Sequence, residues 1–456
     1  MTSLTTEEKL RKLASIDQRQ AEAGWMFYLS GSKDERIEAD ELVDVMLHKK
    51  LGKDYKEKVF LDPVDKDKLK GEYHLGTVQY PPGIAYAPYG LRENEWIKHL
   101  LIVGMTGPGK TNLAFQILLQ LKAHNKPFMV FDWKRSYRDL RQLPAMQSLK
   151  VFTIAKDVAP FHFNPLIPPP NTSPGEWLMK LVDVMLHSYF CGAGVEYLLR
   201  EAIDWTYEKC GMFEEQLKEI PTFHHVKSYI YKKNVQGRMQ LWKASALRVL
   251  ESLTFRHGLG PVLNVDKQWD YEKLLHENVV MELDVLADAD KIFFIEAMIL
   301  WLYEYRKTEG KREVFKHALV IEEGHHVLSQ HKEIHEGAET IMETCLRQIR
   351  EFGESVVVID QEPSKISNSI KANTYVKICF NLGNGKDIQE IARCMNLTEE
   401  EAGYIDLLDV GQAIVAMKGR AHVPLLVGFP RISLIKGIIA DPSLRSTYYR
   451  KILNHA

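Results

Sequence analysis

The eight residues GMTGPGKT at positions 104–111 constrain the fold of this chain more than any other feature. They match the pattern G-x-x-x-x-G-K-[ST] in full. A short apolar run, residues 100–103, precedes them, and an apolar segment of helical character, residues 110–124, follows. A strand, a glycine-rich turn and a helix in this order predict a phosphate-binding loop in an α/β domain. The glycines allow backbone N–H groups and the start of the helix to face a phosphate.

The side chains of this loop have expected roles in binding ATP and Mg²⁺. Lys110 is expected to reach the β- and γ-phosphates, and Thr111 to coordinate Mg²⁺. Pro108 has no N–H group, so the loop has one donor fewer. The candidate nucleotide-binding residues are Gly104, Thr106, Gly107, Gly109, Lys110, Thr111 and Asn112.

Four further apolar runs predict the rest of the sheet. Residues 128–131, 279–283, 318–321 and 356–359 are short and continuous rather than alternating. Such runs are typical of parallel strands covered on both faces. Helical patterns between them predict a doubly wound, mainly parallel sheet in an α/β domain. The stretch 163–174 is rich in proline and interrupts this alternation, and residues 175–258 then have a helical pattern that predicts an inserted helical subdomain.

Other local patterns predict the remaining organisation. Residues 4–23 read as one amphipathic helix whose capping box is formed by Thr5 and Glu8, and residues 39–51 as a second helix. Alternating apolar residues with Gly and Pro over 73–91 indicate short strands and turns. The expected segments are 1–72, a helical oligomerisation or docking segment; 73–170, the first part of the core; 171–260, the helical insertion; 261–435, the second part of the core; and 436–456, a helical tail.

Composition excludes several classes of protein. The formal net charge is −2, so DNA binding would depend on local charge. The five cysteines have no CxxC spacing, which argues for reduced thiols and against a zinc ribbon or a disulfide framework. No apolar run approaches the roughly 20 residues of a membrane span. No apolar stretch follows the charges of the N-terminus, so no secretory signal is expected, and we predict a cytoplasmic protein.

A second motif supplies acids. The apolar run 317–321 ends in Glu322 and Glu323. Beside a phosphate-binding loop, Glu322 is expected to hold the Mg²⁺ shell and Glu323 to act as general base on the attacking water. Four histidines follow, which could bind a metal, but without HExxH spacing they are better explained as helix and loop residues. They are His325, His326, His331 and His335.

A third motif follows the last of these runs. The run 356–359 continues into Asp360 and Gln361. Gln361 is expected to hydrogen-bond the γ-phosphate or its water, although a polar residue in an ordinary turn is the alternative. Upstream, Arg347 and Arg350 lie three apart on one helical face. From the residues alone, both would be surface arginines.

Taken together, these motifs resemble the HerA/FtsK superfamily of RecA-like hexameric ATPases, and are most similar to HerA-type DNA translocases. The resemblance extends over about residues 76–430. It is carried by GMTGPGKT at 104–111, FNPL at 163–166, LVIEEGHH at 319–326, RQIREFGESVVVIDQEPS at 347–364 and GQAIV at 411–415.

The resemblance implies roles for individual residues. It places Lys110 and Thr111 on nucleotide and Mg²⁺, Glu322 and Glu323 as the acidic pair, and Gln361 as sensor. It makes Arg350 the arginine donated to a neighbouring subunit, with Arg347 as second choice. The chain departs from the family at Glu362, where an arginine is usual, and at Pro108, where a serine is common. Its helical N-terminus also replaces the family's usual small β-barrel.

The function implied by the resemblance is ATP-driven translocation of double-stranded DNA by a homo-hexameric ring. The expected partner is a separate nuclease or sirtuin-like effector, in DNA processing or antiviral defence, and no membrane is expected. Two alternatives stay open: an ATP-gated ring scaffold that regulates an effector without pulling DNA, and a conjugation or secretion ATPase. Residues 227–256 carry seven basic residues against one acid, which fits DNA contact or a solvated helical face equally. Lys134, Arg135 and Arg138 form a second candidate.

Overall fold

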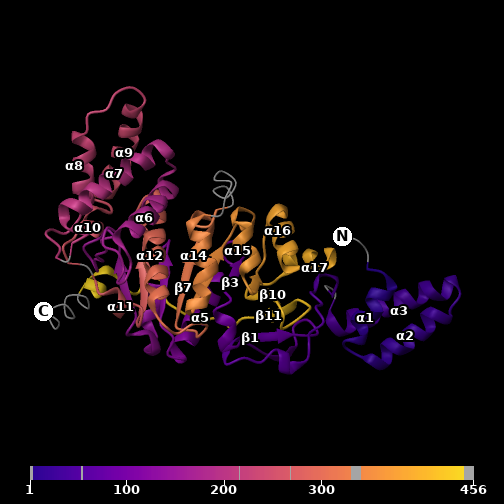
Figure 1. Ribbon diagram of the computed structural model, residues 1–456. Coiled ribbons are helices and arrows are strands. Elements are labelled where there is room, and N and C mark those ends of the chain that lie inside the picture. Colours follow the sequence, from indigo (N-terminus) through magenta and orange to yellow (C-terminus); the bar gives the residue numbers. More distant parts are fainter. Residues whose placement is uncertain (1–3, 53–54, 215, 268, 330–339, 446–456) are drawn as a thin grey trace. The chain divides into compact units, whose positions relative to one another are not determined.

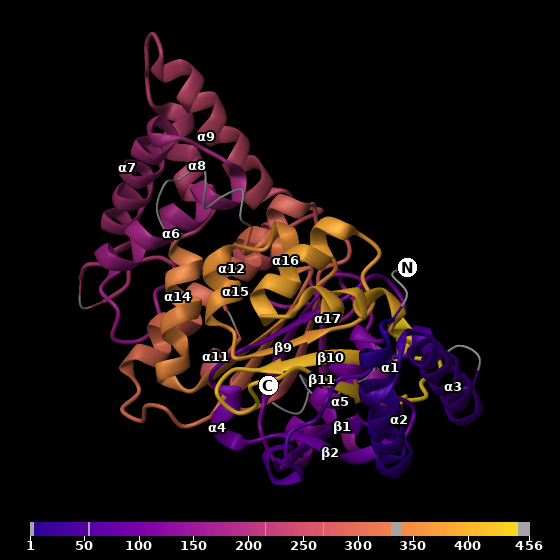
Figure 2. The same ribbon diagram turned by 90° about the vertical axis from the view of Figure 1, so that its right-hand side faces the viewer.

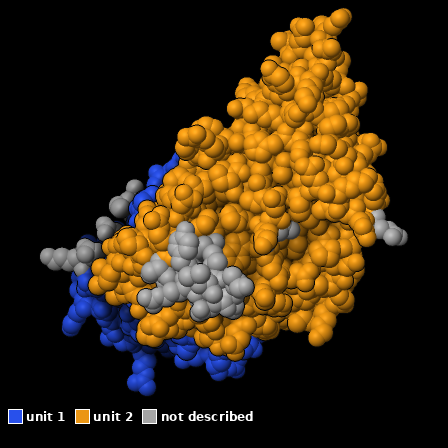
Figure 3. Space-filling model, turned by 90° about the vertical axis from the view of Figure 1, so that its left-hand side faces the viewer, with its two compact units in different colours: residues 1–92, 103–110, 376–431 blue, residues 93–102, 111–375, 432–456 orange. Residues whose placement is uncertain are grey.

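The computed structural model describes residues 4–52, 55–214, 216–267, 269–329 and 340–445. The chain divides into two compact units, which Figure 3 shows in different colours. Unit 1 consists of residues 1–92, 103–110 and 376–431. Unit 2 consists of residues 93–102, 111–375 and 432–456. Each unit therefore joins segments that are far apart in the sequence.

Unit 2 contains six strands that lie side by side in the order β3-β8-β7-β4-β6-β5. They are β3 (Leu100–Val103, with its last residue in unit 1), β4 (Phe128–Asp132), β5 (Lys150–Thr153), β6 (Asn278–Glu282), β7 (His317–Glu322) and β8 (Glu354–Asp360). The pairs β4–β6, β4–β7, β5–β6 and β7–β8 are parallel. Every residue of β4, β7 and β8 is buried, so both faces of these strands are covered. The predicted mainly parallel, doubly wound α/β fold is confirmed.

Helices alternate with these strands. They are α4 (Glu93–Trp96), α5 (Lys110–Ala123), α10 (Gly260–Leu263), α11 (Tyr271–Leu274), α12 (Asp288–Thr308), α14 (Ile341–Ile349) and α15 (Asn368–Asn373). Most residues of α12 are buried, because the helix packs against both α14 and α6 (Pro174–Tyr189). A helix that is apolar on nearly all sides belongs in the interior, and α12 forms much of the core of unit 2.

The stretch predicted to be helical, residues 175–258, contains four helices. They are α6 (Pro174–Tyr189), α7 (Ala193–Cys210), α8 (Phe223–Lys232) and α9 (Met239–Thr254), seen in magenta at the upper left of Figure 1. Pro174 begins α6 at a position where its missing N–H costs nothing. Gly211, at φ 79°, ends α7 in the left-handed region. Helices α8 and α9 pack on each other and on α7.

Unit 1 contains an antiparallel arrangement that the sequence analysis did not predict as a whole. Its strands lie in the order β2-β1-β11-β10-β9, and every pair is antiparallel. They are β1 (Tyr73–Gln79), β2 (Ala85–Leu91), β9 (Val376–Cys379), β10 (Gln412–Met417) and β11 (Leu425–Gly428). The strands predicted over residues 73–91 are confirmed. Helices α16 (Gly385–Met395) and α17 (Glu399–Gly403) connect β9 to β10.

The N-terminal part of unit 1 is helical (indigo in Figure 2), and its bounds differ from those predicted. The single helix expected over residues 4–23 is wrong in extent. Helix α1 (Thr6–Ala14) stops, and Asp17 caps a new helix, α2 (Gln18–Ser30), by accepting a bond from Gln20 N–H. Helix α3 (Lys33–Leu51) begins before the predicted residue 39.

Two observations explain the stability of these three helices. The capping box of Thr5 and Glu8 is present, as predicted. The helices also share a core of buried apolar side chains. Its members are Leu10, Leu13, Ala21, Val43, Leu47 and Tyr55.

Two further expectations concern the ends and the membrane. Most of the predicted C-terminal helix lies outside the described residues, which end at residue 445. Within the described ranges, no helix combines the length and apolar character that crossing a membrane requires.

Candidate active site

The glycine-rich loop of unit 1 is shaped by Phe380, which follows β9. A Cβ atom added at Gly104 would lie 2.7 Å from Phe380 Cβ, and one at Gly109 would lie 2.9 Å from Phe380 Cε1. Gly109 also has φ 134°, which side chains rarely allow. Backbone bonds fix the loop, from Met105 N to the Asn381 carbonyl and from Gly411 N to the Pro108 carbonyl, both at 2.8 Å. Close packing on Phe380 is therefore one physical reason for the glycines of the motif.

Lys110 folds back into this loop. Its Nζ donates to the carbonyl oxygens of Gly104 and Met105, both at 2.5 Å, and the residue is only 9% exposed. A phosphate oxygen is a stronger partner for an ammonium group than a neutral carbonyl. Thr111 and Asn112 continue the motif in unit 2, where Asn112 Oδ1 accepts a bond from Ile432 N at 2.7 Å.

In unit 2, three neighbouring strands end in a carboxylic acid at the same level. Strand β4 ends in Asp132, β6 in Glu282 and β7 in Glu322. Asp132 pairs in register with Glu282, and the residues before Asp132 and Glu322 pair with each other. All three side chains are buried. The sequence motifs predict a role for only one of them, Glu322.

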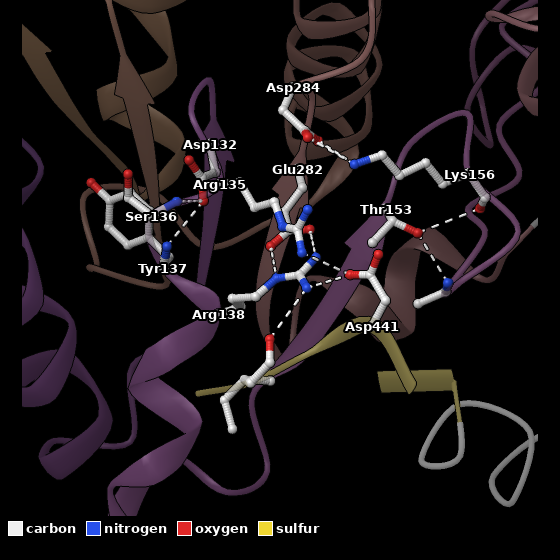
Figure 4. A network of polar contacts seen from close by, with 12 residues as sticks. Asp132, Arg135, Ser136, Tyr137, Arg138, Thr153, Lys156, Glu282, Asp284 and Asp441 are labelled. Carbon is white, nitrogen blue, oxygen red and sulfur yellow. Dashed lines mark hydrogen bonds and ion pairs between the residues drawn. The ribbon is translucent and has the colours of Figure 1, made fainter. Parts of the chain in front are cut away.

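The loop that follows β4 supplies partners for two of these acids. Asp132 accepts backbone N–H bonds from Lys134, Ser136 and Tyr137 at 3.1, 2.6 and 3.0 Å. The hydroxyl of Tyr137 donates to Glu322 Oε1 at 2.9 Å. Figure 4 shows how this turn wraps the end of β4. The loop therefore keeps its backbone in place through Asp132.

Arg138, in the 3₁₀ turn η3 (Arg138–Gln142), neutralises the third acid. Its guanidinium binds the Glu282 carboxylate through two nitrogens, with Nε at 2.6 Å from Oε1. Nη1 of the same group lies 2.6 Å from Asp441 Oδ1, and Arg135 Nη2 also binds Asp441, at 2.9 Å (Figure 4). Arg138 is 2% exposed. Buried and paired in this way, it fixes the C-terminal segment to the sheet edge.

Burial changes the pKa values of Glu322 and Asp132 at this edge of the sheet. It raises the pKa of Glu322 to about 7; the Tyr137 hydroxyl opposes this shift, whereas the charge of Glu323 adds to it. Burial also raises the pKa of Asp132 well above its usual range, and the charge of Glu322 adds to that effect. Neighbouring carboxyls that cannot both ionise freely share a proton near neutral pH. A bound cation would favour ionisation of the pair.

The raised pKa of Glu322 predicts a pH-dependent effect of neutralising it. An unfolded glutamate loses its proton near pH 4.5, whereas folded Glu322 keeps it until about pH 7. The contribution of protonated Glu322 to the free energy of unfolding is therefore complete below pH 4.5 and is lost as the pH rises through 7. We expect Glu322→Gln to raise the free energy of unfolding at pH 8 by on the order of 3 kcal/mol and to change it little at pH 4.5. Urea unfolding without Mg²⁺ at both pH values measures this, and equal shifts at both would contradict it.

Glu323 begins the turn after β7 in an unusual conformation. Its φ is 48°, in the left-handed region. The next residue must be glycine, because a Cβ on Gly324 would lie 2.4 Å from Val358 Cγ1 of β8. Glu323 Oε1 accepts a bond from Gln361 Nε2 at 2.5 Å and also forms an ion pair with Lys134. The predicted general base and the predicted sensor are thus brought together, from the ends of β7 and β8.

A histidine and an aspartate support the same turn. His325 Nδ1 lies 2.9 Å from Asp360 Oδ2, and the backbone N–H of His325 donates to Asp360 Oδ2 at 2.6 Å. Burial alone would lower the pKa of His325, but the bond to Asp360 and the charges of Asp360 and Glu323 raise it. His326 stacks on Trp133, with ring centroids 4.6 Å apart and planes inclined by 4°. The turn after β7 is therefore fixed from both sides.

The histidines do not make a convincing metal centre. Glu323, His325 and Asp360 offer ligand atoms within 4.8 Å of one another. However, the Nδ1 atom of His325 is already engaged by Asp360, and a protonated imidazole donates bonds rather than binding a metal. His331 and His335 lie outside the described residues. We assign His325 and Asp360 to positioning the turn that carries Glu323.

Comparison with known protein families identifies the family of the chain that carries this site. The family described as "Helicase HerA, central domain" matches residues 73–300, half of the chain. The chain belongs to this HerA family. It is accordingly a P-loop ATPase, as the motifs predicted. No curated protein matches the sequence.

Solved structures share the fold of this HerA-family ATPase at low identity. VirB4 of Thermoanaerobacter pseudethanolicus is 14% identical with a TM-score of 0.59, over 82% of this chain and 99% of VirB4. The bacterial conjugative coupling protein TrwBΔN70, unbound, is 12% identical with a TM-score of 0.60, over 82% of this chain and 92% of TrwB. TrwB in complex with ADP and Mg²⁺ is 13% identical with a TM-score of 0.59, over 83% and 95%.

The two predicted arginines of the HerA-family ATPase lie at the end of α14. Arg347 is in its last turn, and Arg350 begins the 3₁₀ turn η6 (Arg350–Phe352). Both are exposed. Among the described residues, no hydrogen bond or ion pair reaches the guanidinium of Arg350. Gly353 ends the turn at φ 91°, where a Cβ would lie 2.1 Å from the Val314 carbonyl.

Helix α14 is anchored by His99, a residue that the sequence analysis missed. His99 Nε2 lies 2.7 Å from the Leu346 carbonyl, and its Nδ1 accepts a bond from Val356 N at 3.1 Å. Burial lowers the pKa of His99 to about 4, which keeps the ring neutral, as the acceptor role of Nδ1 requires. The ring thus ties the arginine-bearing helix to β8.

Three of the seven basic residues in the segment 227–256 have the following partners within the chain. Lys227 pairs with Glu251, and Lys233 with Glu201. Lys243 Nζ donates to the carbonyls of Tyr231 and Lys233, at the C-terminal end of α8. These contacts favour the interpretation as a solvated helical face over DNA contact for these three lysines.

Proposed function

We propose that this HerA-family ATPase is a ring-forming, ATP-driven DNA translocase. Lys110 binds the nucleotide phosphates, Thr111 and Glu322 serve Mg²⁺, and Glu323 activates the attacking water. The observation that carries the proposal is the arrangement at the ends of β7 and β8. There Glu323 is hydrogen-bonded by Gln361, in a HerA-family chain with a complete phosphate-binding loop.

The chemistry of the donor set fits ATP and Mg²⁺. Mg²⁺ prefers oxygen ligands and binds through one or two protein oxygens together with the phosphates. Thr111 and Glu322 supply a hydroxyl and a carboxylate. When bound, Mg²⁺ neutralises charge on the phosphate oxygens. The likeness in fold to TrwB, which was solved in complex with ADP and Mg²⁺, supports a nucleotide and Mg²⁺ as ligands of this site.

Ring formation is supported by Arg350. An exposed arginine with no ion pair among the described residues can serve a neighbouring subunit, where it would stabilise charge on the transferred phosphoryl group. A closed ring of identical subunits uses such head-to-tail contacts. We propose a homo-hexamer with Arg350 as this trans-acting residue and Arg347 as its second basic group.

The N-terminal helices of unit 1 support docking of a separate effector, such as a nuclease or a sirtuin-like protein. Met26 and Leu29 of α2 are 73% and 66% exposed, and Val45 of α3 is 63% exposed. Exposed large apolar side chains on two adjacent helices are typical of interaction surfaces. Such a partner would supply the second activity in DNA processing or antiviral defence.

A second candidate function is that of a conjugation-type ATPase. The fold likeness to VirB4 and to the conjugative coupling protein TrwB favours it. The two candidates differ in whether a membrane partner is needed.

The test is ATP hydrolysis by the purified protein with and without linear double-stranded DNA, combined with its mass in solution. We expect DNA to raise turnover several-fold and the particle to contain about six subunits. Turnover that DNA leaves unchanged, in a particle of any size, would contradict the translocase and leave the ATP-gated scaffold. Lys110→Ala, which removes the phosphate-binding cation, is the control for contaminating ATPases.

A further inference from the structure

We infer that two exposed surfaces of opposite charge bind each other between two copies of this chain. The acidic surface is the outward face of the first half of α3, here called the acidic ridge. The basic surface is the end of the helical insertion between α8 and α9, here called the basic tip. This contact goes beyond the proposed function, since it does not involve Arg350 and assumes neither hydrolysis nor DNA translocation.

The acidic ridge consists of side chains that the packing of α3 directs away from its core. Ala39, Val43 and Leu47 recur every four residues and are buried, and α3 packs on both α1 and α2. Residues on the other side of the helix therefore face outward. Those that form the ridge are all exposed: Asp34, Ile37, Glu38, Glu41 and Leu42.

The carboxylates of the ridge carry charge that the chain does not neutralise. Asp40 and Asp44, on the same helix, both bind a lysine of α1. By contrast, no ion pair or hydrogen bond among the described residues reaches the carboxylates of Asp34, Glu38 and Glu41. Like charges three or four residues apart on a helix repel each other. A cationic partner would therefore relieve a repulsion within the ridge.

Apolar side chains flank these acids. Ile37 and Leu42 are 55% and 49% exposed. Arg36 lies between them in sequence, but its guanidinium is directed to α2, with Cζ 5.6 Å from the ring centroid of Tyr28. The apolar residues of α2 proposed above for an effector are not part of the ridge. The ridge thus offers apolar anchors beside negative charge, a combination that is typical of protein interfaces.

The basic tip has the opposite charge. Residues 231–243, YKKNVQGRMQLWK, contain four basic residues and no acid. Figures 1 and 2 show the loop between α8 and α9 at the free end of the helical insertion. Lys233 and Lys243 have partners inside the chain. Lys232 and Arg238 are exposed, and no ion pair within the described ranges reaches them.

The apolar anchors of the tip stand on a fixed backbone. Tyr231 and Leu241 are 73% and 71% exposed. Trp242 packs against Gly194 of α7, where an added Cβ would lie 2.2 Å from Trp242 Cδ2. The guanidinium of Arg238 lies over the same indole, with Cζ 5.6 Å from the ring centroid. A surface that is already ordered loses little entropy on binding.

A second copy of the chain matches both surfaces in charge and in apolar anchors. Every copy carries a ridge and a tip, so the ridge of one copy can bind the tip of the next. Closed rings of identical subunits use such head-to-tail contacts. Nucleic acid fits the tip less well, because only two of its four cations are left for phosphates and the exposed aliphatic Leu241 has no partner on a phosphate backbone.

The test reverses the charges of each surface and measures mass in solution over a range of protein concentrations. The ridge variant is Glu38→Lys with Glu41→Lys, and the tip variant is Lys232→Glu with Arg238→Glu. We expect each variant to need at least a tenfold higher concentration than the unchanged protein to form the same particle, because repulsion replaces attraction. Unaltered assembly of either variant, or an unchanged protein that stays a single chain throughout, would overturn the inference.

Two recombinations show whether the contact joins different copies. One chain that carries all four substitutions has opposite charges again, and we expect it to assemble like the unchanged protein. An equimolar mixture of the ridge variant and the tip variant should do the same, because each altered surface then meets its complement. Assembly of the four-substitution chain without assembly of the mixture would place the contact within one chain and overturn the second copy. Failure of both would overturn the pairing itself.

Asp204→Lys with Glu208→Lys is the matched control, because these exposed acids lie four residues apart on α7 and outside both surfaces. This variant changes the net charge by the same amount as the ridge variant and should assemble like the unchanged protein. Its failure to assemble would assign the effect to net charge and overturn the inference. Thermal unfolding shows whether each variant is folded. Mass is measured without hydrolysis, so turnover that Lys110→Ala does not abolish would contradict the proposed function alone.

Discussion

Replacing Glu323 with glutamine is expected to lower the turnover number for ATP by about 10²- to 10⁴-fold, because a general base contributes an effect of this size. Glutamine has the shape of glutamate and can still accept the bond from Gln361 Nε2 through its amide oxygen. It cannot take a proton from water. Binding of ATP should persist, since Lys110 and the glycine-rich loop are unchanged. Single-turnover hydrolysis and nucleotide binding by equilibrium dialysis measure the two effects separately.

Glu313→Gln is the matched control for this variant. Glu313 is also a glutamate in the left-handed region, at φ 54°, but it is exposed and lies outside the acidic edge. Its replacement should leave turnover unchanged, which separates loss of the base from backbone effects in this conformation. Turnover by Glu323→Gln within tenfold of the unchanged protein would show that Glu323 is not the base.

Local motifs made the phosphate-binding loop and the acidic strand predictable. The loop is contiguous in sequence, and so are the run 317–321 and the pair Glu322 and Glu323. The support of the loop was not predictable in the same way. Phe380, which requires glycine at positions 104 and 109, is distant in the chain, and the short strands of unit 1 give no register by themselves.

The supporting residues of the acidic edge depend on strand register. Asp132 follows a predicted strand directly, but only the pairing of β4 with β6 and β7 places it beside Glu282 and Glu322. The pairing of His325 with Asp360 likewise needs β7 and β8 to be neighbours. A rule that examines the residue after each apolar run would have found Asp132.

Charge counting along the sequence does not separate buried cations from exposed ones. Arg138 was a candidate for phosphate binding, yet it is 2% exposed and bound to Glu282. Lys134, from the same run, is exposed and bound to Glu323. Two cations four residues apart thus have different chemistry, because one faces the sheet edge and the other faces solvent. Burial, which the sequence pattern does not reveal, separates them.

The largest expected effect on stability comes from Glu354 at the start of β8. Its carboxylate binds Arg306 Nε at 2.6 Å and His317 Nδ1 at 2.7 Å, and all three side chains are buried. Removing one partner of a buried ion pair typically costs about 3–5 kcal/mol, because the other charge is left uncompensated. We expect Glu354→Ala to lower the free energy of unfolding by this amount, measured by urea unfolding at pH 7.

Two comparisons separate this network from a general loss of packing. Glu309→Ala removes a carboxylate from the same Arg306, but that side chain is 27% exposed and should cost about 1 kcal/mol. The second comparison is acid titration. Burial alone would raise the pKa of Glu354, but His317 and Arg306 lower it to about 2. Its contribution is therefore complete above pH 4.5 and is lost as the pH falls towards 2. Equal costs for both variants would contradict the prediction.

The effect of Glu354→Ala on catalysis should follow from folding alone. Strand β8 runs from Glu354 to Asp360, so Glu354 lies at the opposite end of the strand from Gln361 and the acidic edge. At a temperature where the variant is folded, its turnover number should match that of the unchanged protein, whereas its inactivation temperature should fall. A turnover number reduced tenfold in folded protein would instead mean that the buried network sets the position of β8, and with it the distance between Gln361 and Glu323.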